Sequence, residues 1–159
     1  MLAIKNQLAA VGLAMLSVAP AFGSAPQAAD VWTITGFSAS YTWENNRTAS
    51  IDFDLFVPNT ADGAPNHCSI AIPGLEAILL PNVTDANCDR VGYKFDFTLY
   101  TMTGGLYSGA DLCVYGGDSV RRHYISDGDF VLVPYYEEDG TEHPDIEYRG
   151  ASEFDLDMA

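Results

Sequence analysis

In the stretch "ASIDFDLFV", residues 49–57, the apolar residues Ala49, Ile51, Phe53, Leu55 and Val57 share one face, and Ser50, Asp52 and Asp54 share the other. Successive side chains of a β-strand point to opposite faces of a sheet, so this alternation predicts a strand with one face in a core and the other in water. The stretch "VGYKFDFTLY", residues 91–100, repeats the pattern, with Lys, Asp and Thr between its apolar residues. Both stretches therefore indicate half-buried strands, as antiparallel sheets contain.

The same period of two extends over most of the chain. Turn sequences rich in Asn, Asp and Gly, such as "NTADGAPN" and "EEDG", separate the apolar runs, and these residue types tolerate the backbone angles of tight hairpins. The sequence thus predicts an all-β fold, a single antiparallel β-barrel or sandwich of about eight to ten strands. One helical turn is an alternative for "GLEAIL". Strands are expected near residues 31–43, 48–57, 68–72, 75–80, 91–102, 106–115, 120–125, 130–136 and 145–149.

The first predicted strand changes phase at Gly36. Before this glycine, Trp32 and Ile34 share a face. After it, the apolar alternation that runs from Phe37 to Trp43 has the opposite phase. An extra residue at a glycine is typical of a β-bulge, so we expect the strand to bend there.

The N-terminal region has the anatomy of a secretory signal peptide. A basic residue precedes an apolar run of 11 residues, Leu8–Val18, which is too short to span a bilayer. Ala19 and Ala21 then form the A-x-A pattern of a cleavage site. We therefore expect residues 1–25 to be a signal peptide, cleaved between about 21 and 29, and the protein to be secreted and extracellular.

The rest of the chain is the right length for one domain, expected over residues 30–150, with 151–159 as a flexible acidic tail. The chain has 22 Asp and Glu residues and a formal net charge of −15. Such a surface repels nucleic acid and anionic membranes, so neither is expected as a partner. Two sequons, at Asn46 and Asn82, are candidate N-glycosylation sites.

The three cysteines are Cys68, Cys88 and Cys113. Zinc and thioredoxin-like sites need closely spaced pairs such as C-x-x-C, whereas 19 residues separate Cys68 from Cys88. Since a secreted chain meets an oxidising environment, a structural disulfide is expected and a metal site is not. The pair Cys68–Cys88 is favoured, but spacing does not decide connectivity, and bridges from Cys113 to either partner stay open.

Catalytic patterns are sparse. The three histidines lie in unrelated segments, and no serine occupies a G-x-S-x-G elbow. Asp52 and Asp54 share the outer face of one predicted strand, and glycoside hydrolases use a pair of carboxylates for catalysis. Because acidic residues are so numerous here, such a pair also arises by chance. The chain is therefore expected to be non-enzymatic and to need no cofactor.

Aromatic residues point more clearly to a binding surface. Several tyrosines stand at predicted strand ends or beside turns, near acidic residues. Tyrosine is enriched at protein interfaces because it offers a large, partly polar contact area. The residues expected to contact a partner are Tyr107, Tyr115, Tyr135 and Tyr136.

The order of these features resembles a known family. "WTITGFSASY" and "SIDFDLFVP" lead to "CSIAIPG…LLPNVTDANCDRVGYKFDFTLY", and over residues 30–115 this order resembles the small secreted fungal proteins related to the major allergen of Alternaria. The resemblance implies a β-barrel with no established enzymatic mechanism and a clasp between Cys68 and Cys88. It also implies an allergen, elicitor or effector that binds host defence proteins of the thaumatin-like type, or small phenolic ligands. The family's second disulfide and its N-terminal dimer cysteine have no counterpart here, so monomer and dimer stay open.

Three functional hypotheses follow. The first is a secreted, non-enzymatic binding protein, a fungal effector or elicitor that engages a host extracellular protein. The second is a carrier of a small hydrophobic or phenolic ligand in the barrel, and the third is a weak glycoside hydrolase. A tyrosine-rich surface favours the first, an apolar pocket the second, and a cleft with two facing carboxylates the third.

Overall fold

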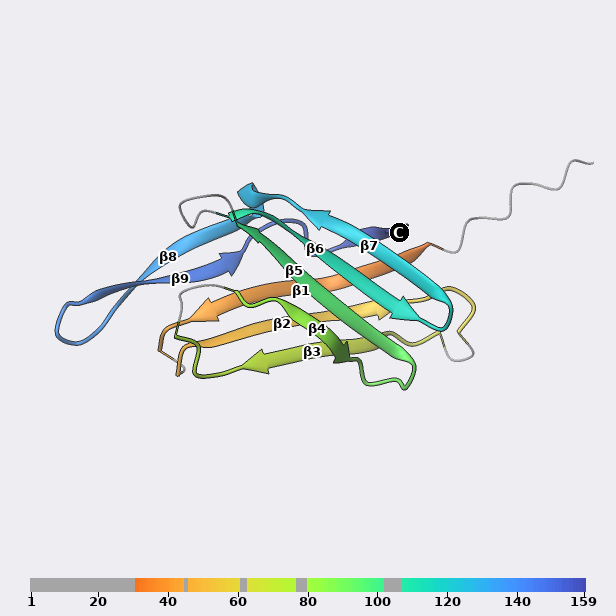
Figure 1. Ribbon diagram of the computed structural model, residues 1–159, viewed down its shortest axis with the longest axis horizontal. Coiled ribbons are helices and arrows are strands. Elements are labelled where there is room, and N and C mark those ends of the chain that lie inside the picture. The colour runs from red at the N-terminus through yellow and green to blue at the C-terminus, as the bar shows by residue number, and fades with distance from the viewer. Residues whose placement is uncertain (1–30, 45, 61–62, 77–79, 102–106) are drawn as a thin grey trace, which may run out of the picture.

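A computed structural model describes residues 31–44, 46–60, 63–76, 80–101 and 107–159 (Figure 1). The predicted signal peptide, 1–25, and its cleavage region lie outside the described residues. The described chain is almost entirely β-structure with one short 3-10 helix, η1, Asp127–Asp129. The strands are β1 Trp32–Thr42, β2 Thr48–Phe56, β3 Asn66–Ile72, β4 Val83–Asn87, β5 Tyr93–Thr101, β6 Tyr107–Gly116, β7 Ser119–Ile125, β8 Phe130–Tyr136, β9 Glu142–Tyr148 and β10 Phe154–Met158.

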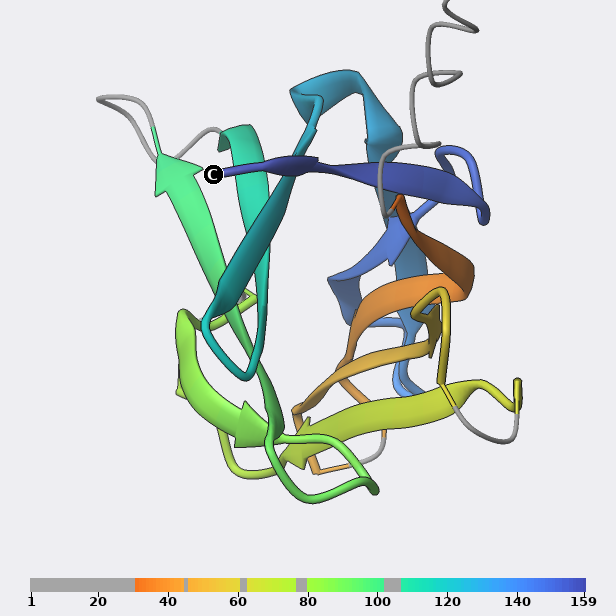
Figure 2. The same cartoon turned by 90° about the vertical axis from the view of Figure 1, so that its right-hand side faces the viewer.

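Eight of these strands form one antiparallel sheet that curls into a nearly closed barrel, which confirms the predicted fold class. Their order is β3-β2-β1-β10-β7-β6-β5-β4, and Figure 2 shows them arranged around a common interior. The other two strands, β8 and β9, form a hairpin that joins the sheet where β9 pairs with the end of β1. This hairpin projects beyond the barrel in Figure 1.

The alternating strands place their apolar side chains in one core. Ile51 and Phe53 of β2 are each 1 % exposed, and Phe95 and Phe97 of β5 are fully buried. Burying one such side chain stabilises the fold by about 1.5–3 kcal/mol. The polar side chains between them, such as Asp52, are only half-buried on the outer face, as the sequence pattern predicts.

The predicted bulge in β1 is present at Gly36. The register with β2 shifts between Thr35 and Ser38, and Gly36 has a φ of 65°. That left-handed conformation is accessible to glycine at little cost. The extra residue lets Ile34 and Phe37 both face the core, where they are 0 % and 3 % exposed.

The strand predicted at 75–80 is wrong for the residues described there. Gly74 has a φ of 74°, which ends the extended path, and the described residues on either side of 77–79 belong to no strand or helix. Residues 77–79 themselves lie outside the described part. The next strand is β4, which pairs with β5 through a register shift and forms one end of the sheet.

The tail predicted to be flexible, 151–159, contains β10 instead. This strand pairs with β1 on one side, where Leu156 lies opposite Trp32, and with β7 on the other. Leu156 is 3 % exposed, and Figure 2 shows β10 crossing from the β1 side of the barrel to the β7 side. The prediction fails because β10 satisfies hydrogen-bonding groups of two distant strands, which short-range sequence patterns do not reveal.

Candidate binding site at the seam and the β8–β9 hairpin

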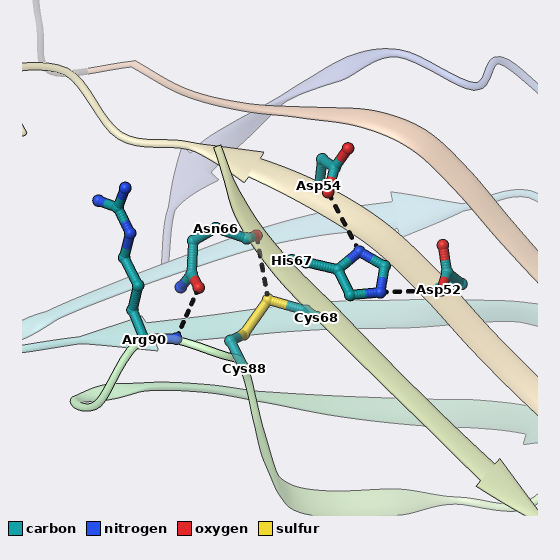
Figure 3. Close-up of polar contacts among 7 residues, drawn as sticks. All are labelled: Asp52, Asp54, Asn66, His67, Cys68, Cys88 and Arg90. Carbon is teal, nitrogen blue, oxygen red and sulfur yellow. Dashed lines mark hydrogen bonds and ion pairs between the residues drawn. A yellow bond between two sulfur atoms is a disulfide. The ribbon is translucent and has the colours of Figure 1, made fainter. Parts of the chain in front are cut away.

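A disulfide closes the barrel at its seam, where β3 meets the end of β4 (Figure 3). Cys68 of β3 is bonded to Cys88, with the two Cα atoms 4.1 Å apart, and the pair also forms an isolated antiparallel bridge. Next to it, the backbone N–H of Asp89 donates to the carbonyl of His67 at 2.8 Å. The favoured pairing is thus confirmed. Disulfides persist in oxidising compartments, which fits an extracellular protein.

Cys113 is a free thiol, half-buried in β6. Burial raises the pKa of this thiol, and the negative charges of Asp111 and Asp96 raise it further. The thiolate is the reactive form of cysteine, so a raised pKa makes this side chain less reactive at neutral pH. The two alternative bridges to Cys113 are not formed.

His67 faces outward from β3 and lies between two aspartates of β2 (Figure 3). Its Nδ1 is 3.1 Å from Asp54 Oδ1, and its Nε2 is 3.3 Å from Asp52 Oδ2. The hydrogen bond with Asp54 is the main cause that raises the pKa of His67; burial opposes the shift, and the charges of Asp52, Asp54 and Asp89 support it. The sequence shows the aspartate pair, but the histidine comes from the neighbouring strand.

We predict that protonated His67 stabilises the fold in a pH-dependent way. Because its folded pKa is raised above the unfolded value of about 6.5, the stabilisation is complete below that value and is lost as the pH rises through the folded pKa. In urea titrations, His67→Gln should therefore lower the free energy of unfolding more at about pH 5.5 than at about pH 8.5. Asp52→Asn with Asp54→Asn should lower the His67 pKa measured by NMR. A wild-type pKa at or below that of an unfolded histidine contradicts this prediction.

A second cluster lies where the β8–β9 hairpin meets the end of β1. The backbone N–H of Trp43 donates to Asp145 Oδ1 at 2.7 Å, and its indole Nε1–H donates to Glu137 Oε1 at 2.9 Å. His143 of β9 stacks on the indole, with ring centroids 3.6 Å apart and planes inclined by 8°. The imidazole Nε2 lies 3.2 Å from the same Glu137 oxygen. These contacts fix the Trp43 ring against the hairpin.

Trp43 forms part of the wall of an open pocket of about 520 Å³, which we call the Trp43 pocket. A second aromatic ring comes from β8, and the other lining side chains are acidic. Two aromatic rings and four carboxylates around one hollow suit a cationic group, because aromatic faces and carboxylates both attract positive charge. The lining residues are Trp43, Glu44, Tyr135, Glu137, Glu138 and Asp139.

The pKa shifts of two side chains set their protonation states in the Trp43 pocket. Burial raises the pKa of Tyr135, and the charges of Glu44 and Glu137 raise it further. Hydrogen bonds from Thr141 lower the pKa of Asp139, and the backbone N–H of Thr141 lies 2.8 Å from Asp139 Oδ1. The tyrosine hydroxyl therefore stays neutral and the aspartate stays ionised at neutral pH.

The predicted contact tyrosines divide between two regions. Tyr135 lines the Trp43 pocket, and Tyr136 beside it is 59 % exposed. Tyr115, near the end of β6, is half-buried and donates to Asp96 Oδ2 at 2.7 Å, a bond that raises the pKa of Tyr115 to about 12. Tyr107 begins β6, but its side chain lies outside the described part. The end of β6 and the β8–β9 turn lie at opposite ends of Figure 1, so these tyrosines do not make one surface.

Both sequon asparagines are exposed. Asn46 lies in the β1–β2 turn, three residues after Trp43, so a glycan there would border the Trp43 pocket. Asn82 precedes β4, and its Oδ1 accepts the backbone N–H of Leu99 at 2.8 Å. Glycosylation at either position stays a prediction.

Within the described ranges, no group of three or more His, Cys, Asp or Glu side chains could hold a metal ion. No helix in that part of the chain is long and apolar enough to cross a membrane.

Comparison with known proteins adds no relative from which a function could be carried over. No family model matches the chain, and neither the curated proteins nor the solved structures contain a match to it. The resemblance to the Alternaria allergen family therefore stays a prediction.

Proposed function

We propose that this chain is a secreted, non-enzymatic binding protein whose Trp43 pocket receives a cationic side chain of a basic extracellular protein. The observation that carries the proposal is the pocket itself, which is lined by two aromatic and four acidic residues. The formal net charge of −15 also favours a positively charged partner. Such a charge attracts a basic partner during diffusional encounter and repels acidic ones.

The packing of the interior favours this surface site over a ligand carried in the barrel. Tyr41, Phe95 and Phe97 are fully buried, and Phe53 is 1 % exposed. Phe53 and Phe95 meet edge to face, with ring centroids 5.1 Å apart. These large side chains occupy the space that a hydrophobic or phenolic ligand would need.

The geometry around His67 gives less support to a hydrolase. A glycosidase pair needs one protonated carboxylic acid with a raised pKa beside an ionised carboxylate. Here Asp52 and Asp54 both pair with the same histidine, so the imidazole lies between the two carboxylates that would have to flank a glycosidic bond (Figure 3). We therefore propose binding without catalysis.

The resemblance to fungal allergens supplies a biological setting for this proposal. In that setting the chain acts outside a host cell as an effector or elicitor. Its partner is a host extracellular protein, for which defence proteins of the thaumatin-like type are the first candidates. The predicted signal peptide and the disulfide between Cys68 and Cys88 support an extracellular location for the protein.

The test is capture of a partner from host extracellular fluid by the wild type and by a variant of the Trp43 pocket. Glu44→Gln with Glu138→Gln removes two exposed carboxylates from the pocket and leaves the Glu137 hydrogen bond to Trp43 in place. The affinity for the captured basic protein should fall about tenfold, which corresponds to about 1.4 kcal/mol. The affinity should also fall as salt is added, because exposed charges are screened.

The matched control is Glu153→Gln with Asp157→Asn, which removes two exposed charges beside or within β10. This variant should bind like the wild type. An equal loss of affinity in both variants would mean that only the net charge matters, and it would contradict a specific pocket. Polysaccharide turnover that disappears in Asp52→Asn with Asp54→Asn would replace the binding proposal with an enzymatic one.

A further inference from the structure

A cationic side chain of the protein itself lies against the Trp43 ring. The guanidinium carbon of Arg47 lies 4.2 Å from the centroid of the Trp43 ring. His143 stacks on the same ring at 3.6 Å and nearly parallel to it. Two groups this close to one centroid cannot share a face without a clash. The imidazole and the guanidinium therefore cover opposite faces of the indole.

The backbone that presents Arg47 is unfavourable for an arginine. Asn46 and Arg47 have φ angles of 55° and 52°, so two successive residues adopt the left-handed conformation. Turns of this kind favour Asn followed by Gly, because a side chain in this conformation crowds the backbone. The turn is held from outside, since Gly74 N–H donates to the Asn46 carbonyl at 2.8 Å and Leu75 N–H donates to the Arg47 carbonyl at 3.2 Å. The fold thus places the cationic side chain of Arg47 at a position whose backbone conformation favours glycine.

Cations are scarce in this chain, which has seven Lys and Arg residues against 22 Asp and Glu. One of the seven covers a ring that lines an acidic pocket, and Glu44 of the same β1–β2 turn lines that pocket too. A guanidinium suits this place because it stacks flat on an aromatic face and offers several N–H donors to carboxylates. An ammonium group stacks less well on an aromatic face and matches carboxylates less well than a planar guanidinium.

We propose that Arg47 is an internal ligand, and that the Trp43 pocket is selective for an arginine side chain of the partner, which displaces the Arg47 guanidinium from the indole. This inference rests on the proposed function and adds the identity of the cation and a competitor within the chain. Binding of the partner then requires Arg47 to leave Trp43. Removing its side chain should therefore strengthen binding of a guanidinium.

The experiment uses Arg47→Gly, the residue that the left-handed turn accommodates best. The probe is N-acetyl-arginine amide, and the neutral isostere N-acetyl-citrulline amide is the ligand control. The chain has two tryptophans, so an NMR spectrum of indole N–H groups resolves Trp43 while Trp32 serves as an internal reference. Arg47→Gly should bind the arginine probe with a Kd about tenfold lower than the wild type. Only the Trp43 signal should shift, and the citrulline probe should not bind.

Arg47→Lys is the matched variant, because it keeps a positive charge and loses the planar group. Its affinity for the arginine probe should lie between those of the wild type and Arg47→Gly. Equal affinities of the wild type and Arg47→Gly, or equal shifts with citrulline, overturn the inference. An unchanged urea midpoint for Arg47→Gly excludes unfolding as the cause.

The two proposals fail in different ways. If Arg47→Gly gains affinity for the arginine probe but the Glu44 and Glu138 substitutions leave the affinity for the captured partner unchanged, the proposed function fails. The cation site then stands. If capture depends on those glutamates but Arg47→Gly binds the probe no better than the wild type, the competition by Arg47 fails and the proposed function stands.

Discussion

Replacing Cys88 by serine should lower the free energy of unfolding by about 2–5 kcal/mol. The bridge spans 20 residues, and closing a loop of that length contributes about 3 kcal/mol in the chain-entropy model. The effect should be large because Cys68 and Cys88 join the two end strands of the sheet, β3 and β4. Domains have total stabilities of about 5–15 kcal/mol, so this loss should also reduce the yield of secreted protein.

Urea unfolding of the purified variants measures this effect, with Cys113→Ser as the control. Cys113 carries a free thiol on the half-buried part of β6, and its replacement should change stability by less than about 1 kcal/mol. Equal stabilities of Cys88→Ser and the wild type would contradict the role of the clasp in closing the barrel.

Replacing Leu156 by alanine should cost about 2–5 kcal/mol, and removing residues 151–159 should abolish cooperative unfolding. Leu156 is 3 % exposed, and Phe154 of the same strand stacks on His123 with ring centroids 4.0 Å apart. Without β10, the backbone groups of β1 and β7 that pair with it would lose their partners. Unpaired buried backbone groups cost as much as lost hydrogen bonds.

Met158→Ala is the control for this prediction, because Met158 belongs to the same strand but is 78 % exposed. Its stability should stay within about 0.5 kcal/mol of the wild type. If the chain without 151–159 unfolds with the wild-type midpoint, then β10 is not a part of the cooperative barrel.

The long strands were predictable because their alternation extends over many residues. The stretch at 49–57 lies almost entirely within β2, and the stretch at 91–100 corresponds to β5. Each long strand buries one face, and a slip by one residue would turn its apolar side chains to water. Local sequence therefore carries enough information to place these strands and, through Gly36, the bulge in β1.

The short strands were not predictable in the same way. β4 and β10 have five residues each, too few for an alternation of apolar and polar residues to stand out, and three of the five residues of β4 are polar. Asp85 within β4 has a φ of 55°, which interrupts any simple alternation. Both strands form because longer strands beside them offer hydrogen-bonding groups, and this information lies far away in the sequence.

The candidate site was predictable only in its residue types. The strand-end tyrosines and the acidic hairpin "EEDG" are visible in the sequence, and Tyr135 does line the Trp43 pocket. Trp43 and His143, in contrast, lie 100 positions apart and meet only because β9 pairs with β1. The same holds for His67 and the aspartates of β2, which are neighbours through strand pairing.

Site-specific photocrosslinking tests the central claim, that a basic partner contacts the Trp43 pocket, most directly. A p-benzoylphenylalanine replaces Tyr135, which lines the pocket, or Tyr124, which is 54 % exposed on β7 and serves as the control. The central claim predicts a crosslink from position 135, at an arginine-containing segment of the partner, and none from position 124. Crosslinks from position 124 alone, or equal crosslinks from both positions, would contradict it.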